Sequence, residues 1–226
     1  MLFCIGVTED AASGRAARPG DTAGVSSNPP SASRIPVFVI TGTSGAGKGT
    51  LERALLSRLP ELELAVSATT RERRPGEIDG REYHFISDAE FDARLDSEEF
   101  LEWVEFPWGQ RSGTLRSEID RIADSGRVPM LDLEPDGAIR VKRRVPNSVT
   151  IFVSAPTFAE NERRLRARAT ESEGESDERL DLARKQLEQA DAFDYEIVND
   201  DLDRAVEEIS AIVHGRLADA GTMSEP

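Results

Sequence analysis

Residues 41–50 read Thr41-Gly42-Thr43-Ser44-Gly45-Ala46-Gly47-Lys48-Gly49-Thr50. An apolar run over 35–40 precedes them, and the apolar residues that follow fall on one helical face: Leu51, Ala54, Leu55 and Leu59. A glycine-rich turn between a buried strand and a helix directs backbone N–H groups and the positive end of the helix dipole at one point. The stretch therefore predicts a phosphate-binding loop, in which Gly42 to Thr50 contact a nucleotide and Lys48 reaches its outer phosphates.

Lysine usage supports this interpretation. Three of the 28 basic residues are lysines, so a chain that otherwise uses arginine keeps a compact ammonium at position 48. The strict motif has Ser or Thr directly after the lysine, whereas here Gly49 stands there and Thr50 follows. The alternative is a glycine-rich turn with an incidental lysine. The strand–turn–helix order favours nucleotide binding.

Composition limits the other classes of function. The length of 226 residues suits one α/β domain with insertions, and no apolar run approaches membrane-spanning length. One cysteine and two histidines argue against a disulfide framework and a zinc site, and they fit a cytoplasmic protein. The net charge of −15 disfavours nucleic acid polymers and anionic membranes as partners.

Strand and helix patterns alternate along the chain and predict an α/β fold, with a parallel sheet flanked by helices. Strands are expected at 36–41, 128–133, 148–154 and 194–198. Helices are expected at 48–58, 114–125, 157–167, 177–191 and 202–213. Residues 1–34 and 215–226 are expected to be disordered tails, because they bury too little apolar surface.

Two segments interrupt the alternation within the domain at 35–214. We expect an inserted α+β subdomain over 62–113, with strand signals at 62–67, 83–86 and 100–106 around a helix at 88–96; the core is then 35–61 and 114–214. The polar segment 167–178 is flanked by arginines. It is expected to form a mobile lid over phosphates.

Hydroxyls and guanidiniums are concentrated over residues 67–77, which read Ser67-Ala68-Thr69-Thr70-Arg71-Glu72-Arg73-Arg74-Pro75-Gly76-Glu77. Guanidinium groups bind phosphate oxygens bidentately, and the phenol of Tyr83 nearby adds a neutral donor. A basic patch alone is most often a solvated face. Beside a phosphate loop it predicts a second site for an anionic ligand.

With these motifs the chain resembles the guanylate kinase family over about residues 36–213. Further matching motifs are Asp79-Gly80-Arg81-Glu82-Tyr83-His84-Phe85, Phe100-Leu101-Glu102-Trp103, Arg164-Leu165-Arg166-Ala167-Arg168-Ala169-Thr170-Glu171, Arg179-Leu180 and Val198-Asn199-Asp200-Asp201-Leu202. The resemblance implies the P-loop NTPase fold, a GMP-binding subdomain, and Mg²⁺-dependent transfer of the terminal phosphoryl group of ATP to GMP.

The resemblance also implies roles for single residues. It makes Lys48, Arg164, Arg168 and Arg179 the cations of phosphoryl transfer, adds Asn199 to the ATP contacts, and gives Thr50 and Asp132 contact with Mg²⁺ only through water. Glu102 and Ser67 would read the guanine. The implied GMP site comprises Ser67, Arg71, Arg74, Glu77, Tyr83, Glu102, Ser112, Thr114 and Asp132.

The chain departs from the family pattern in three places: Gly49 removes the usual Mg²⁺-binding hydroxyl, and the other two departures bear on the acceptor. Besides Gly49, the chain has Glu134-Pro135-Asp136-Gly137 where the family shows Asp-x-Gln-Gly. Around Ser112 it departs from the family's Gly-Asn-Tyr-Tyr-Gly stretch, and Ser112 is the nearest match to a phosphate-binding tyrosine. Two alternatives therefore stay open: a kinase for another acceptor such as a phosphorylated ribose, and a non-catalytic module that binds phosphorylated proteins. The retained Glu102 and the intact phosphate loop favour the guanylate kinase.

Overall fold

The computed structural model describes residues 35–106, 109–168 and 173–221. Its core is a parallel five-stranded sheet with the strand order β2-β7-β1-β8-β9. The strands are β1 (Val37–Gly42), β2 (Leu62–Leu64), β7 (Val128–Asp132), β8 (Ser148–Ser154) and β9 (Tyr195–Val198). The sheet confirms the predicted α/β P-loop class of fold, and the expected core strands lie within one residue of the observed ends.

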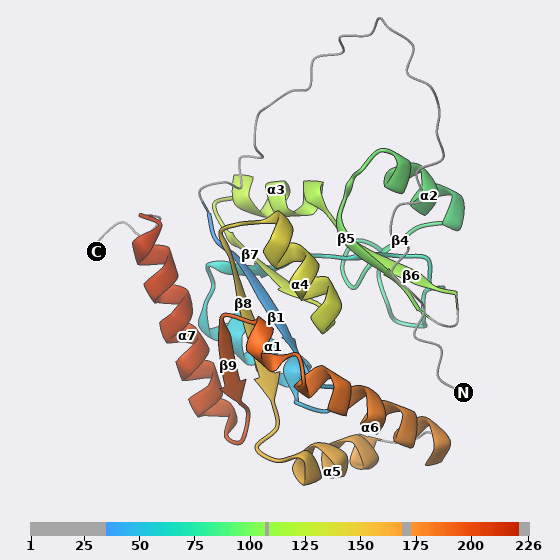
Figure 1. Cartoon of the computed structure of the whole chain (residues 1–226). Helices are drawn as coiled ribbons and strands as arrows, with labels where there is room; N and C mark the ends of the chain where they lie inside the picture. The colour runs from blue at the N-terminus through green and yellow to red at the C-terminus, as the bar shows by residue number, and fades with distance from the viewer. Residues whose placement is uncertain (1–34, 107–108, 169–172, 222–226) are drawn as a thin grey trace, which may run out of the picture.

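Helices cover both faces of the core sheet (Figure 1). On one face, α1 (Lys48–Arg58) and α7 (Leu202–Asp219) pack against a cluster that includes Phe38 and Ile40 of β1. On the other, α3 (Arg116–Asp124) and α4 (Pro135–Arg144) pack against a cluster that includes Val37 and Val39. Successive residues of β1 thus enter opposite cores, and this alternation fixes the register of the central strand.

The insertion forms a second sheet with the order β4-β3-β6-β5, which lies beside α4 in Figure 1. Its strands are β3 (Ala68–Thr69), β4 (His84–Phe85), β5 (Phe100–Glu105) and β6 (Arg111–Leu115). The helix α2 (Asp88–Asp96) covers one face of this sheet through a buried cluster of Ala68, Phe91, Phe100 and Leu115. The opposite face is left to carry polar side chains.

Two expectations about this region were wrong, and one helix next to it was not predicted. Strand β2 pairs with β7, so residues 62–64 belong to the core sheet and the insertion begins after them. Thr114 lies in β6, and α3 begins only at Arg116. Helix α4 was not predicted, because Pro135 and Gly137 weaken a helical pattern. Pro135 stands at the first helical position, where its fixed φ is favourable and its absent N–H costs nothing.

The C-terminal part also differs from expectation. Helix α7 continues to Asp219 and so overlaps the expected tail at 215–226, while residues 222–226 and 1–34 lie outside the described residues. Helices α5 (Phe158–Arg168) and α6 (Glu173–Leu187) enter the expected lid from both sides, and residues 169–172 lie outside the described part. Lid closure stays a prediction. None of the described helices is long and apolar enough to cross a bilayer.

Candidate active site

The turn between β1 and α1 depends on two glycines. Gly45 and Gly47 both have φ of 89°, and Gly47 directly precedes the first residue of α1. A Cβ atom on Gly47 would lie 2.7 Å from Nδ2 of Asn199, so a side chain there would displace that amide. The left-handed conformation, which glycine adopts without strain, lets the chain turn tightly into the helix. The N-terminus of α1 is therefore presented at the carboxyl edge of the sheet, where it favours an anion.

Two buried asparagines hold the other side of this loop. Asn161 of α5 accepts a hydrogen bond from Oγ1 of Thr43 at 3.2 Å and donates Nδ2 to the carbonyl of Ser44 at 2.9 Å. Asn199, directly after β9, donates Nδ2 to the carbonyl of Ala46 at 2.7 Å. The amide of Asn199, predicted to contact ATP, thus shapes the loop itself. Asn161 was not predicted, because no local pattern connects it to residue 43.

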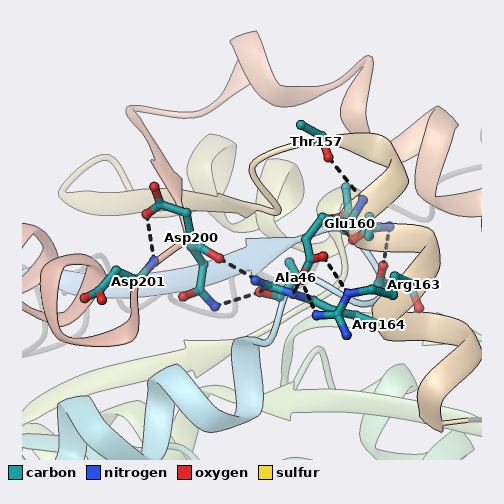
Figure 2. Close-up of polar contacts among 11 residues, drawn as sticks. Ala46, Thr157, Glu160, Arg163, Arg164, Asp200 and Asp201 are labelled. Carbon is teal, nitrogen blue, oxygen red and sulfur yellow. Dashed lines mark hydrogen bonds and ion pairs between the residues drawn. The ribbon is translucent and has the colours of Figure 1, made fainter.

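Arg164 lies between Glu160 and the loop at Ala46 (Figure 2). Its Nε is 2.7 Å from Oε1 of Glu160, and its Nη1 donates to the carbonyl oxygens of Asn199 and Ala46 at 3.0 and 3.4 Å. Arg163 also binds Glu160, and the two guanidiniums hold the pKa of that carboxyl well below its ordinary value. Arg164 thus lies beside the phosphate loop, and its role as a cation of phosphoryl transfer stays a prediction. Arg168 and Arg179 belong to α5 and α6, but their side chains lie outside the described residues.

A pair of carboxyl groups lies next to Lys48. Asp132 ends β7 on the sheet face that carries α1, and its side chain is accessible to solvent. Glu52, one helical turn after Lys48, is 6% exposed and shares a hydrogen bond with Asp132. Burial, and then the charge of Asp132, raise the pKa of Glu52 to about 8, while Lys48 acts in the opposite direction. Glu52 was not predicted; its i,i+4 spacing places it on the helical face of Lys48, but nothing in the sequence connects it to Asp132.

Stability should fall with rising pH because of Glu52. The folded protein keeps this carboxyl protonated up to about pH 8, whereas the unfolded chain ionises it near 4.5, so between these values the folded state binds the extra proton. The free energy of unfolding then decreases by about 1.4 kcal/mol per pH unit from this group. Urea unfolding at pH 5, 6.5 and 8 should show that Glu52→Gln gains stability relative to the wild type as pH rises. A constant difference between the two proteins would contradict the assignment.

A second candidate site lies around the buried carboxylate of Glu102 in β5. It is 3% exposed, and its Oε1 accepts hydrogen bonds from N and Oγ1 of Thr114 at 3.1 and 3.0 Å. Arg144 and Arg140 of α4 donate to the carbonyls of Leu101 and Trp103, on either side of Glu102, at 2.7 and 2.9 Å. Burial raises the pKa of Glu102, while the hydrogen bonds from Thr114 and the charges of Arg140 and Arg144 act in the opposite direction.

The first turn of α4 brings the second site next to the core. A Cβ atom placed on Gly137 would be 3.1 Å from Oε2 of Glu102. Helix α4 follows β7, which ends at Asp132, so Glu102 lies beside the carboxyl edge that also carries the phosphate loop. Both hydrogen bonds from Thr114 go to Oε1 of Glu102, so Oε2 is the oxygen that can accept a hydrogen bond from a ligand.

The predicted anion cluster assembles around Arg71. Its guanidinium binds both carboxylate oxygens of Glu77, at 2.8 and 3.1 Å, and lies 5.3 Å from the centre of the Tyr83 ring. Glu77 also accepts the N–H of Arg74 at 2.7 Å, and these donors lower its pKa. Glu77 thus orients Arg71 rather than standing apart as a separate contact. Ser67 precedes β3, and its carbonyl accepts the N–H of His84 at 2.9 Å.

Neighbouring residues of β6 point to opposite faces of the second sheet. Ser112 lies on the face of Thr114 and donates its hydroxyl to the carbonyl of Ala68 at 3.0 Å. Arg111 lies on the other face, where Asp88 and Asp92 of α2 bind it and its guanidinium is 4.6 Å from the centre of the Phe91 ring. Arg111 is therefore directed to α2, away from the face that carries Glu102.

Comparison with known proteins agrees with this geometry. The sequence model of the guanylate kinase family matches residues 34–216. A guanylate kinase of Rubrobacter xylanophilus is 45% identical over 177 residues, which are 78% of this chain and 92% of that protein. A guanylate kinase of Synechococcus elongatus is 43% identical over 177 residues, covering 78% and 96%. The crystal structure of a guanylate kinase from Anaplasma phagocytophilum superposes with a TM-score of 0.63 at 28% identity, over 80% of this chain and 86% of that one.

Proposed function

The chain belongs to the guanylate kinase family, and from this we propose that it transfers the terminal phosphoryl group of ATP to GMP, forming ADP and GDP. The observation that carries the choice of acceptor is the buried Glu102 with Oε2 available. The N1–H and the exocyclic N2 amine of guanine form a pair of donors that suits a carboxylate. Adenine has an acceptor at N1 and no 2-amino group, so the same site rejects it.

On the donor side, the phosphate loop and Lys48 hold the phosphates of ATP. Phosphoryl transfer depends mainly on positioning and on neutralising charge at the transferring group. Lys48 supplies one cation, and Arg164 supplies a second beside the loop. Arg168 and Arg179 complete the set in this proposal, because they stand on the two helices that adjoin the loop.

Mg²⁺ fits the residues at the end of β7. Asp132 is an accessible carboxylate beside Lys48, and Oε1 of the buried Glu52 has no hydrogen-bond partner among the described residues. Mg²⁺ keeps several of its waters and takes few protein ligands, so Asp132 and the Thr50 hydroxyl would bind it through water. When bound there, the ion would supply positive charge that offsets the charge of the phosphates.

On the acceptor side, Arg71, Tyr83 and Arg74 would bind the phosphate of GMP. The ion pair with Glu77 holds the Arg71 guanidinium in place before a ligand arrives. Pre-orientation of this kind lowers the entropy cost of binding. Ser67, Thr114 and Glu102 would then contact the base.

A coupled assay of ADP formation across nucleoside monophosphates tests this function. With ATP and Mg²⁺, GMP should support rapid turnover, whereas AMP, CMP and a ribose phosphate should support little. Turnover with the ribose phosphate in place of GMP would overturn the choice of acceptor. Binding of GMP without any turnover would overturn the proposed activity itself.

Ser112→Tyr should strengthen acceptor binding. The hydroxyl of Ser112 donates to the carbonyl of Ala68, and Arg111 is bound by α2. In these positions neither side chain donates a hydrogen bond to the phosphate of GMP. A phenol at position 112 would add one hydrogen bond to a charged group, worth about 1.5–3 kcal/mol. The KM for GMP should fall about tenfold, while the KM for ATP stays constant. An unchanged KM for GMP would place position 112 outside the acceptor site.

A further inference from the structure

A buried glutamine side chain bridges three parts of the core. Gln186, in the last turn of α6, is 4% exposed. Its Oε1 accepts the backbone N–H of Ser44 in the phosphate loop at 2.9 Å, and its Nε2 donates to Oε2 of Glu134 at 2.7 Å. Glu134 directly precedes α4 and lies two positions after Asp132. The bridge therefore connects the phosphate loop to α6 and to the start of α4.

The two hydrogen bonds fix the orientation of the amide. The carbonyl oxygen must face the N–H of Ser44, and the NH₂ group must face the carboxylate of Glu134. The reversed orientation would place donor against donor and acceptor against acceptor, which is costly in a buried position. Ser44 is thereby held at a set place without a ligand, in a loop whose function depends on where its N–H groups point.

The bridge also sets the rotation of α6 about its own axis. Seven residues correspond to nearly two helical turns, so Arg179 starts from the same face of α6 as Gln186, about 10 Å along the axis. Anchoring that face to the phosphate loop therefore also fixes the rotational position of residue 179 on α6. The amide group of Gln186 thus holds the helix that carries Arg179 in a fixed position relative to the phosphate loop.

We propose that Gln186 is a positioning residue for phosphoryl transfer, which couples α6 to the phosphate loop through Ser44 and Glu134. This inference rests on the proposed function, and the residue itself makes no contact with substrate. Its removal weakens ATP binding and slows the chemical step, because the phosphate loop and the cation on α6 lose their mutual alignment. Binding of GMP by the second sheet stays as it is.

An exchange of the two partners tests the bridge. Gln186→Glu places a carboxylate against Glu134 and removes the donor between them. In the double variant Gln186→Glu/Glu134→Gln, the new carboxylate still accepts from Ser44, and the new amide at 134 donates to it, so the bridge re-forms with the wild-type net charge. We expect kcat of the single variant to fall about tenfold or more, equivalent to about 1.4 kcal/mol. The KM for GMP should stay within about twofold, and the exchange should restore most of kcat.

Gln189→Glu is the matched control. Gln189 donates to Oδ1 of Asp136 at 3.0 Å, so it also connects the segment after α6 to α4, but it does not reach the phosphate loop. This variant should keep the wild-type kcat. An equal fall of kcat in Gln189→Glu, a wild-type kcat in Gln186→Glu, or a folded exchange variant that stays slow would each overturn the proposal. If the single variant does not fold, recovery in the exchange variant decides.

The wild-type assay separates this inference from the proposed function. A wild type that does not phosphorylate GMP overturns the proposed function alone. The bridge is then tested by measuring the Kd for ATP. Gln186→Glu should raise this Kd, whereas the exchange variant and Gln189→Glu should leave it at the wild-type value. An unchanged Kd in Gln186→Glu would overturn the bridge as well.

Discussion

Lys48→Ala should lose at least about a hundredfold in kcat while the protein stays folded. Removal of one group that stabilises developing charge costs about a hundredfold to a thousandfold in a preorganised site. Lys48 begins α1 beside the glycine turn, where in the proposed function the helix N-terminus and the ammonium act on the same phosphates. ADP formation at saturating ATP and GMP, with circular dichroism as a check of folding, measures the effect.

The chain provides a matched control for this variant. Lys185 is an exposed lysine on α6, next to Gln186 but directed to solvent, so Lys185→Ala should keep full activity. If Lys48→Ala retained more than a few per cent of the wild-type kcat, the phosphate loop would be misassigned. Arg164, Arg168 and Arg179 would then have to neutralise the donor phosphates without Lys48, although Arg164 is already bound to Glu160 and Asn199.

Glu102→Gln should cost about a hundredfold or more in kcat/KM for GMP. The substitution keeps an oxygen for Thr114, so the strand pairing survives, but it turns the second atom from an acceptor into a donor that faces the donors of guanine. Sites built on a buried hydrogen bond discriminate strongly when that bond cannot form. Steady-state kinetics with GMP at saturating ATP measure the loss.

Glu105→Gln serves as the control for Glu102→Gln. Glu105 lies in the same strand but is exposed, so its neutralisation should leave kcat/KM for GMP unchanged. If both variants behaved like the wild type, guanine would be read elsewhere on the second sheet. A loss of activity in both would indicate that the charge of the strand matters more than the single carboxylate.

The elements of the fold that could be predicted from the sequence were those that short, contiguous sequence patterns specify. The strand, the glycine turn and the following helix are contiguous, so residues 37–58 could be assigned before any tertiary contact was known. The α4 helix could not, because Pro135 and Gly137 weaken its pattern while packing against the core sheet stabilises it. Local propensity is a weak prior that tertiary contacts override.

The contacts that hold the site in place were not predictable. Gln186 reaches Ser44 across 142 positions of sequence, and Glu52 reaches Asp132 across the boundary between a helix and a strand. Neither pair has a periodic or compositional signal. The resemblance to a family pointed to residues that contact substrate. The residues that position them became visible only when the strand order brought distant segments to one edge.

The phosphate loop is encoded early in the chain but is held by residues that come much later. The N–H of Thr43 donates to the carbonyl of Val153, and the amides of Asn161 and Asn199 bind the loop from α5 and from the end of β9. During synthesis, these partners leave the ribosome more than a hundred residues after the glycine turn itself. Contacts of such long range close late in folding. We therefore expect a nascent chain to gain stability from nucleotide only after nearly the whole domain has emerged.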